Sequence, residues 1–304
     1  MKNKDELTSI EDKIKVLYIV GGGHSGSTIL SLILGTSPEV HVAGEIKFYN
    51  EHKILDHPMW DYIENVCMCG EDANDCPFWK EVELQVDGEL NIFHYSSLTD
   101  KFLTALKILW PFYHIQKTTQ ANDDYELFKM LDIEARKRKL DVKYILDSSK
   151  SVSRLMHLHT HPQLEVKVIF LVRDGRAYVN SYAKAYRQGF FSWIGQWIIN
   201  NFLTLRYLKK EKIDFYYLSY NALCLETKLQ LTAIGEKFNF RVPDNYIQIV
   251  NDMEYHIRAG NPSRSSLNKF SGLEIDEKWR HEMPRYKRVV SSILLYLFNR
   301  WWVY

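Results

Sequence analysis

Near its N-terminus the chain reads Val16-Leu-Tyr-Ile-Val-Gly21-Gly22-Gly23-His24-Ser25-Gly26-Ser27-Thr28-Ile29-Leu30. The apolar run before Gly21 predicts a buried strand, the glycines predict a tight loop, and residues 27–34 have the periodicity of a helix. A glycine-rich loop that leads from a strand into a helix binds anions, because the first N–H groups of the helix lack partners and its dipole is positive at this end. A purely structural turn is the alternative, but the three elements follow one another in the order that an anion site requires.

This loop differs at one position from the loop that binds ATP in P-loop proteins. Gly21, Gly26 and Thr28 fit the pattern Gly-x4-Gly-Lys-Ser/Thr, but Ser27 stands in the place of the lysine. Because that lysine reaches the β- and γ-phosphates, its absence argues against hydrolysis of a nucleoside triphosphate. The backbone cradle for an anion is unaffected.

Short apolar runs alternate with helical segments along the rest of the chain. Strands are predicted at 15–20, 143–146, 166–172 and 214–218, with another short one just before Glu45, and helices at 27–34, 177–186, 192–208 and 223–238. This alternation predicts an α/β fold of the P-loop-like type, with three layers in which helices flank a central parallel sheet. Residues 51–141 form a long insertion, which we expect to be a mainly helical cap on a single domain spanning residues 1–304.

A second anion site is predicted after the strand at 166–172. Arg173 follows this strand at its carboxyl end, the edge where open α/β sheets bind ligands, and Ser181 lies eight residues further on. An arginine fork and a hydroxyl can bind one phosphate from these positions, although an Arg-Asp pair that caps a helix is the alternative. Together the two sites suit a nucleotide with phosphate groups at both its 5′ and its 3′ position.

The two motifs in this order resemble the sulfotransferases that use 3′-phosphoadenosine 5′-phosphosulfate (PAPS) as donor. The residues that carry the likeness are Gly22-Gly-His-Ser-Gly-Ser-Thr-Ile-Leu30 and Leu171-Val-Arg-Asp-Gly-Arg-Ala177-x3-Ser181. They are most similar to the branch that contains tyrosylprotein sulfotransferases and many bacterial homologues. The likeness extends from Val16 to about Arg264 and is loosest between residues 51 and 141. It implies transfer of a sulfuryl group to a hydroxyl, with release of 3′,5′-ADP (PAP).

The resemblance also assigns residues to the donor. Those implied to bind the 5′-phosphosulfate are Gly23, His24, Ser25, Gly26, Ser27 and Thr28. Those implied to bind the rest of the nucleotide are Arg173 and Ser181 at the 3′-phosphate, Tyr220, and Asn261 and Arg264 in a loop that closes over the donor. The family usually has Arg or Lys at position 24, so His24 removes a fixed positive charge near neutral pH. The family's usual Glu after the tyrosine is Asn221 here.

Three residues are implied to carry the chemistry. Glu45, in Val42-Ala-Gly-Glu45, matches the family's general base, and an exposed loop carboxylate is the alternative. Lys150, at the end of Leu146-Asp-Ser-Ser-Lys150, is expected to stabilise charge on the transferred group together with His24. Asp147 either orients Lys150 or caps the next helix. No metal is expected to be required.

Composition limits the partners and the location. Lys plus Arg number 39 and Asp plus Glu 38 in 304 residues, a net charge of +1 that argues against a general nucleic-acid binder. The acceptor is expected to bear a hydroxyl, in a carbohydrate, lipid, peptide or small metabolite. The apolar run from Val16 to Val20 is too short for a signal peptide or a membrane span, so a cytoplasmic protein is expected. Residues 289–298 predict a terminal helix packed on the core, with contact to a membrane surface as the alternative.

Three of the four cysteines lie close together in the insertion. Cys67, Cys69 and Cys76 have a spacing that could supply three ligands to zinc, with His52 or His57 as the fourth, or could form a disulfide. Free thiols and no metal are the expectation, because no Cys-x2-Cys pair is present. Two other functions stay open: an ATP-dependent P-loop phosphotransferase, and a catalytically silent module that binds PAPS.

Overall fold

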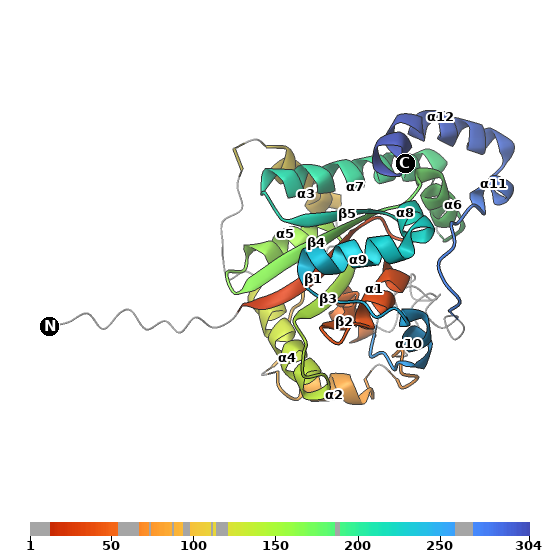
Figure 1. The fold of residues 1–304 in the computed structure, drawn as a ribbon. Helices are drawn as coiled ribbons and strands as arrows, with labels where there is room; N and C mark the ends of the chain where they lie inside the picture. The colour runs from red at the N-terminus through yellow and green to blue at the C-terminus, as the bar shows by residue number, and fades with distance from the viewer. Residues whose placement is uncertain are drawn as a thin grey trace.

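A five-stranded sheet, parallel throughout, forms the centre of the chain (Figure 1). The computed structural model describes residues 13–53, 67–72, 74–86, 88–93, 98–110, 112–113, 121–185, 189–258 and 270–304. The strands are β1 (Ile14–Gly21), β2 (Val40–Gly44), β3 (Tyr144–Lys150), β4 (Leu164–Val172) and β5 (Phe215–Ser219), in the order β2-β3-β1-β4-β5. The predicted α/β class and parallel sheet are confirmed.

β1 lies in the middle of the sheet and is buried on both faces. Val16, Tyr18 and Val20 pack into the core on one face, and Leu17 and Ile19 pack into the core on the other. All five side chains are fully buried. This explains why the strand is almost continuously apolar, since a parallel strand covered on both sides has no polar face.

Helices cover both faces of the sheet and complete three layers (Figure 1). The core on one face includes α1 (Ser27–Gly35), α8 (Tyr220–Leu225), α9 (Thr227–Phe238) and α10 (Tyr246–Asp252). The core on the other face includes α2 (Pro77–Glu83), α3 (Leu98–Leu109), α4 (Asn122–Arg138), α5 (Val152–Thr160), α6 (Gly175–Ala185), α7 (Phe190–Lys210), α11 (Trp279–Glu282) and α12 (Arg285–Trp302). A 3-10 helix, η1 (Ile46–Lys53), follows β2 directly.

The helix predicted at 223–238 is two helices, and this part of the prediction is wrong. Glu226 between α8 and α9 has φ −129° and ψ 42°, which is not helical. The hydroxyl of Thr227 donates to the carbonyl of Leu223 at 2.7 Å, a side-chain bond that competes with the backbone ladder of a continuous helix. The apolar periodicity continues across the break and conceals it.

The insertion at 51–141 is helical where it is described, and α4 is part of the main fold. Leu127, Phe128 and Leu131 of α4 are fully buried in the same core as the β1 side chains Val16 and Tyr18. α4 also contacts β1 and β3 directly. This helix therefore belongs to one of the layers that cover the sheet, whereas the sequence assigns the whole insertion to a cap.

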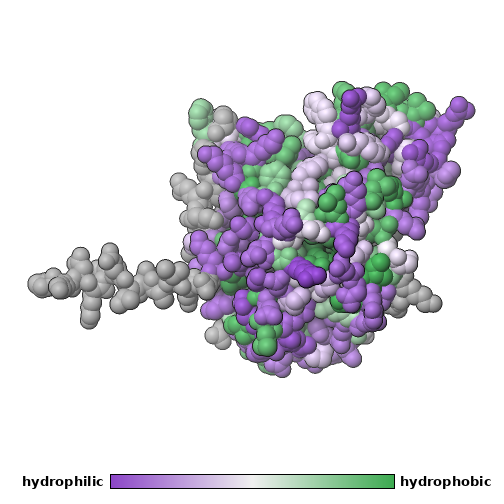
Figure 2. Space-filling model, viewed as in Figure 1, coloured by the Kyte–Doolittle hydropathy of each residue, from purple (hydrophilic) through white to green (hydrophobic). Residues whose placement is uncertain are grey.

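The C-terminal residues form the predicted helix, α12, which packs against α6 and α7. Leu295, Asn299 and Trp302 are buried, while Ile293 and Trp301 are mostly exposed. Figure 2 shows hydrophobic residues on the outer surface of this helix, at the top of the view. Among the described residues, no helix is long and apolar enough to cross a bilayer. Contact of α12 with a membrane surface stays a prediction.

Candidate active site

The carboxyl ends of the five parallel strands meet at one edge of the sheet, and most predicted site residues lie there. β1 lies between β3 and β4, and the chain passes over β1 when it continues from β3 to β4. Open α/β sheets bind ligands at the point where the strand order changes direction in this way. The residues at this edge are the loop 22–26 after β1, Glu45 after β2, Lys150 as the last residue of β3, Arg173 after β4 and Tyr220 after β5.

Two tyrosines pack closely against the glycine-rich loop. A Cβ atom on Gly26 would lie 2.3 Å from Cε2 of Tyr220, and one on Gly23 would lie 2.1 Å from the hydroxyl of Tyr182. Gly26 also has φ +85°, so its lack of a side chain serves both the conformation and the packing. α1 begins at Ser27 and aims its first N–H groups at this loop, as the anion cradle requires.

Arg173 connects the loop after β1 to the tyrosine after β5. Its Nη1 donates to the backbone carbonyl of His24, its Nη2 pairs with Asp276, and its guanidinium lies 5.6 Å from the ring centre of Tyr220. The side chain is 10% exposed, and its Nε has no hydrogen-bond partner among the described residues. Asp276, which sequence reasoning missed, is contributed by the segment before α11.

Ser181 lies in α6, one residue before Tyr182. The Tyr182 ring contacts Gly23 and meets the ring of His24 edge to face, with centroids 4.9 Å apart. α6 therefore packs on the loop through the residue next to Ser181. Asn261 and Arg264, the remaining predicted donor ligands, lie outside the residues that the structure describes.

Glu45 and Lys150 form a buried ion pair. The Lys150 ammonium donates to Oε1 of Glu45, and the Lys47 ammonium lies 3.4 Å from Oε2. Burial alone would raise the pKa of Glu45, but the charges of Lys150 and Lys47 outweigh it and hold that pKa below its ordinary value. Glu45 is thus a carboxylate at neutral pH, and it is buried rather than an exposed loop residue.

Lys150 has an unusual backbone conformation. Among the described residues other than glycine, only four have positive φ, and two of them, His24 at 53° and Lys150 at 66°, belong to this site. Such conformations are unfavourable for residues with a Cβ and concentrate where function constrains the chain. The two backbones are held so that both side chains lie at the carboxyl edge.

Lys47 is a site residue that the sequence did not reveal. It lies two residues after Glu45 in η1, and its backbone N–H donates to Oγ of Ser149 at 3.1 Å. Burial lowers the pKa of its ammonium, although Glu45 opposes that shift. A lysine after a strand is too common a feature in sequences to have identified it.

Asp147 has neither of the two roles expected from the sequence. Its carboxylate accepts hydrogen bonds from Nε of Arg154 at 2.9 Å and from the backbone N–H of Ser149 at 2.8 Å. The side chain that caps α5 is Ser151, which accepts from the backbone N–H of Arg154. Arg154 also pairs with Asp124 at 2.7 Å, so Asp147 belongs to a buried charge network with Arg154 and Asp124.

His24 should remain neutral around neutral pH. Burial, together with the charges of Lys150 and Arg173, lowers the pKa of His24 to about 4, because each disfavours the imidazolium. An NMR titration of the ring carbon, assigned with His24→Gln, should therefore show protonation only in the acidic range. A midpoint at the ordinary histidine value of 6.5 would contradict this electrostatic environment.

The chain is similar in fold to two solved sulfotransferase domains. One, from the curacin biosynthetic pathway, matches with a TM-score of 0.54 and 12% identity over 94% of this chain and 98% of that domain. The other, from the olefin synthase of Synechococcus PCC 7002, matches with a TM-score of 0.52 and 17% identity over 95% of each chain. The predicted P-loop-like fold is confirmed. No protein-family model and no curated protein matches the sequence.

Proposed function

We propose that this chain is a sulfotransferase that moves the sulfuryl group of PAPS to a hydroxyl. The observation that carries the proposal is the meeting of a glycine-rich anion loop, a buried arginine and a buried Glu45–Lys150 pair at one edge of the sheet. Each occupies the end of a different strand. The motif resemblance and the fold of the two solved sulfotransferase domains support the same function.

The residues at this edge suit a nucleotide with phosphate groups at two positions. The loop from Gly23 to Thr28, with the first N–H groups of α1, would hold the 5′-phosphosulfate. Nε of Arg173 is buried and has no hydrogen-bond partner among the described residues, so it can donate to a bound anion. Arg173 would hold the 3′-phosphate together with Ser181. Tyr220 would lie against the nucleotide. A phosphate at Arg173 would displace Asp276 from the arginine.

Glu45 and Lys150 divide the chemistry between them. When bound, the donor supplies an electrophilic sulfur with a good leaving oxygen. Glu45 takes the proton of the acceptor hydroxyl as that oxygen forms a bond to sulfur. Lys150 stabilises the negative charge that builds up as the bond between sulfur and the leaving oxygen breaks. His24 donates one hydrogen bond as a neutral ring, so the positive charge at the site comes from Lys150, Lys47 and Arg173.

This reaction requires no metal at the active site, because the donor has no β/γ-phosphate pair for a divalent ion to bridge. The rival function, ATP-dependent phosphoryl transfer, would need the loop lysine that Ser27 replaces. The acceptor stays a class, a hydroxyl in a carbohydrate, lipid, peptide or small metabolite, since the insertion that would contact it resembles the family least. A cytoplasmic location is part of the proposal.

PAP should stabilise the fold more than ADP does, because only PAP has a 3′-phosphate for Arg173. A thermal-shift screen with PAP, ADP, and ATP with Mg²⁺ measures this, and a ligand at ~100 times its dissociation constant should add roughly 2.7 kcal/mol. Arg173→Ala should abolish the preference for PAP and Ser181→Ala should weaken it. Arg176→Ala is the matched control, since Arg176 pairs with Asp174 and Tyr304. Equal shifts with PAP and ADP would remove the 3′-phosphate site, and a preference for ATP with Mg²⁺ would favour the phosphotransferase.

A further inference from the structure

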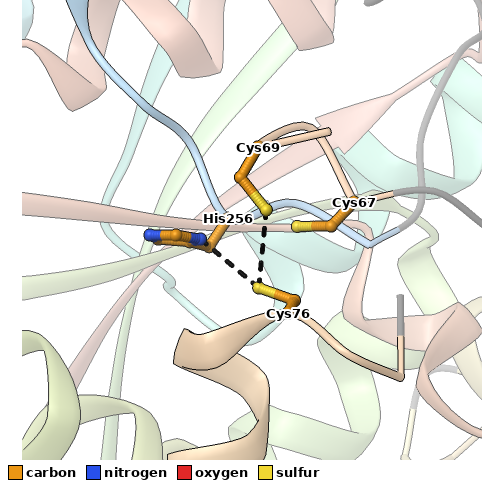
Figure 3. A group of neighbouring side chains, drawn as sticks. All are labelled: Cys67, Cys69, Cys76 and His256. Atoms are coloured by element: carbon orange, nitrogen blue, oxygen red, sulfur yellow. Dashed lines mark hydrogen bonds between the residues drawn. The ribbon is translucent and has the colours of Figure 1, made fainter. Parts of the chain in front are cut away.

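Three cysteines and a histidine from distant parts of the chain meet in one cluster, whose side chains point toward one another (Figure 3). Cys67, Cys69 and Cys76 lie in the insertion, and His256 follows Cys76 by 180 residues. The four ligand atoms all lie within 4.8 Å of one another. Sequence reasoning considered His52 or His57 as the partner of these cysteines. His57 and the side chain of His52 lie outside the described residues, and the histidine that the fold brings to the cysteines is His256.

Two of the separations among the four atoms are close to the edges of a tetrahedral metal site, and the others are within 4.8 Å. With Zn–S bonds of about 2.3 Å and Zn–N bonds of about 2.0–2.1 Å, a tetrahedron has edges of about 3.8 Å between sulfurs and about 3.6 Å between sulfur and nitrogen. Sγ of Cys69 lies 3.7 Å from Sγ of Cys76, and Sγ of Cys76 lies 3.3 Å from Nδ1 of His256. A zinc ion therefore fits between these atoms with only small movements of the side chains.

We propose that Cys67, Cys69, Cys76 and His256 bind one Zn²⁺ as a closed structural site. Three thiolates and an imidazole are a ligand set that selects zinc among the common divalent ions of proteins. With four protein ligands no coordination position is left for water or substrate, so the ion supports the fold and takes no part in sulfuryl transfer. The proposal does not depend on the proposed function.

The protein around His256 fixes its ring in the orientation that the site needs. The ring of Phe78 stacks on the imidazole with centroids 5.3 Å apart and an angle of 8° between the planes. Nε1 of Trp79 donates to the backbone carbonyl of His256 at 3.0 Å. Both aromatic residues belong to α2, which begins directly after Cys76. The helix that follows one proposed ligand thus positions another.

Backbone hydrogen bonds also hold the turn that contains Cys67 and Cys69. The backbone N–H of Gly70 donates to the carbonyl of Cys67 at 2.9 Å, and Gly70 has φ +97°, so the chain turns sharply after Cys69. The N–H of Met68 donates to the carbonyl of Ile257 at 3.0 Å. This bond joins the turn to the residue next to His256. The two segments are paired by their backbones as well as by the proposed ion.

Charged neighbours complement the proposed site. With Nδ1 on the metal, Nε2 of His256 carries the ring proton, and the carboxylate of Glu254, 3.7 Å away, would accept it after a small movement. Three thiolates and one Zn²⁺ leave a net charge of −1, and the guanidinium of Arg138 lies beside the ring, with Nη1 3.3 Å from Nε2. Because both of these nitrogens would carry protons once Nδ1 binds the metal, the guanidinium would turn away from Nε2 while staying beside the site. A positive group next to a negatively charged metal site favours its assembly.

Metal analysis of the purified full-length protein, produced with zinc in the medium, tests the proposal. We expect one Zn²⁺ per chain, and X-ray absorption at the zinc edge should show three sulfur neighbours and one nitrogen. Cys69→Ser and His256→Ala should lose most of the bound zinc. Cys224→Ser is the matched control and should keep it, because Cys224 lies in α8, outside the cluster.

Stability measurements keep the test decisive where a variant fails to fold. A chelator should lower the melting temperature of the wild-type protein, and Zn²⁺ should restore it while Mg²⁺ should not. Zinc absent from the protein, or a zinc neighbour shell without three sulfurs, would overturn the proposal. A disulfide between Cys69 and Cys76, detected by mass spectrometry of protein kept from air, would overturn it too. None of these readouts uses PAPS, so failure here leaves the proposed function standing.

Discussion

Glu45→Gln should lower the rate of sulfuryl transfer by about 10²–10⁴-fold, the usual effect of losing a general base. Glutamine keeps the shape of the side chain and one hydrogen-bonding oxygen for Lys150, but it cannot accept the proton of the acceptor hydroxyl. PAP binding, measured by thermal shift, should change little, because the residues proposed to bind the nucleotide are the loop, Arg173 and Ser181. The loss should therefore appear in turnover and leave donor affinity nearly constant.

The assay needs an acceptor, which can be sought by following label from PAPS into a lysate of the source cell. Slow hydrolysis of PAPS by water is a simpler substitute. Glu39→Gln is the matched control: Glu39 precedes the same strand at the opposite edge of the sheet, where it pairs with Lys143. Undiminished transfer by Glu45→Gln would show that another group takes the proton, and His24 would be the next residue to test.

Lys150→Met should lower turnover by about 10²–10³-fold, as loss of one group that stabilises transition-state charge does. It should also change the pH dependence. Lys150 is one of the two charges that hold the pKa of Glu45 below its ordinary value, so its removal should raise that pKa. Because the base must be deprotonated, the acidic limb of the pH–rate profile should move to higher pH. A purely structural role for Lys150 would not shift this limb.

Lys47→Met distinguishes the two lysines. Lys47 also lies beside Glu45, so its removal should shift the acidic limb in the same direction. If Lys150 alone faces the transferred group, the Lys47 variant should lose much less of its maximal rate. Equal losses of maximal rate in both variants would contradict a special role for Lys150 and would assign to the two ammoniums a shared effect on Glu45.

The fold and much of the candidate site could be predicted because they depend on local patterns. The run from Val16 to Leu30 contains strand, loop and helix start in one continuous stretch. Glu45, Lys150 and Arg173 each come at the end of a predicted strand, and parallel strands bring such ends to one edge whatever the intervening loops do. Prediction of the strands was therefore sufficient to predict that these three residues lie at the same edge.

The rest depends on contacts that no local pattern reports. Asp276 reaches Arg173 and His256 reaches Cys76 from segments more than a hundred residues away. The path of the C-terminal segments over the sheet decides which side chains face one another. Composition and periodicity do not predict that path. The role of Asp147 was missed for the same reason, since its partner Arg154 is itself oriented by Asp124 from the insertion.

The central position of β1 also has a consequence for folding during synthesis. β1 is made before both of its neighbours in the sheet, β3 and β4, which end at Lys150 and Val172. At ribosomal rates of roughly 5–20 residues per second, this apolar strand waits about 8–30 s for its second partner to be made. An unpaired apolar strand is a template for aggregation during that time. The nascent chain should therefore depend on chaperones that bind extended apolar segments, and the yield of folded protein should be limited by the completion of β4.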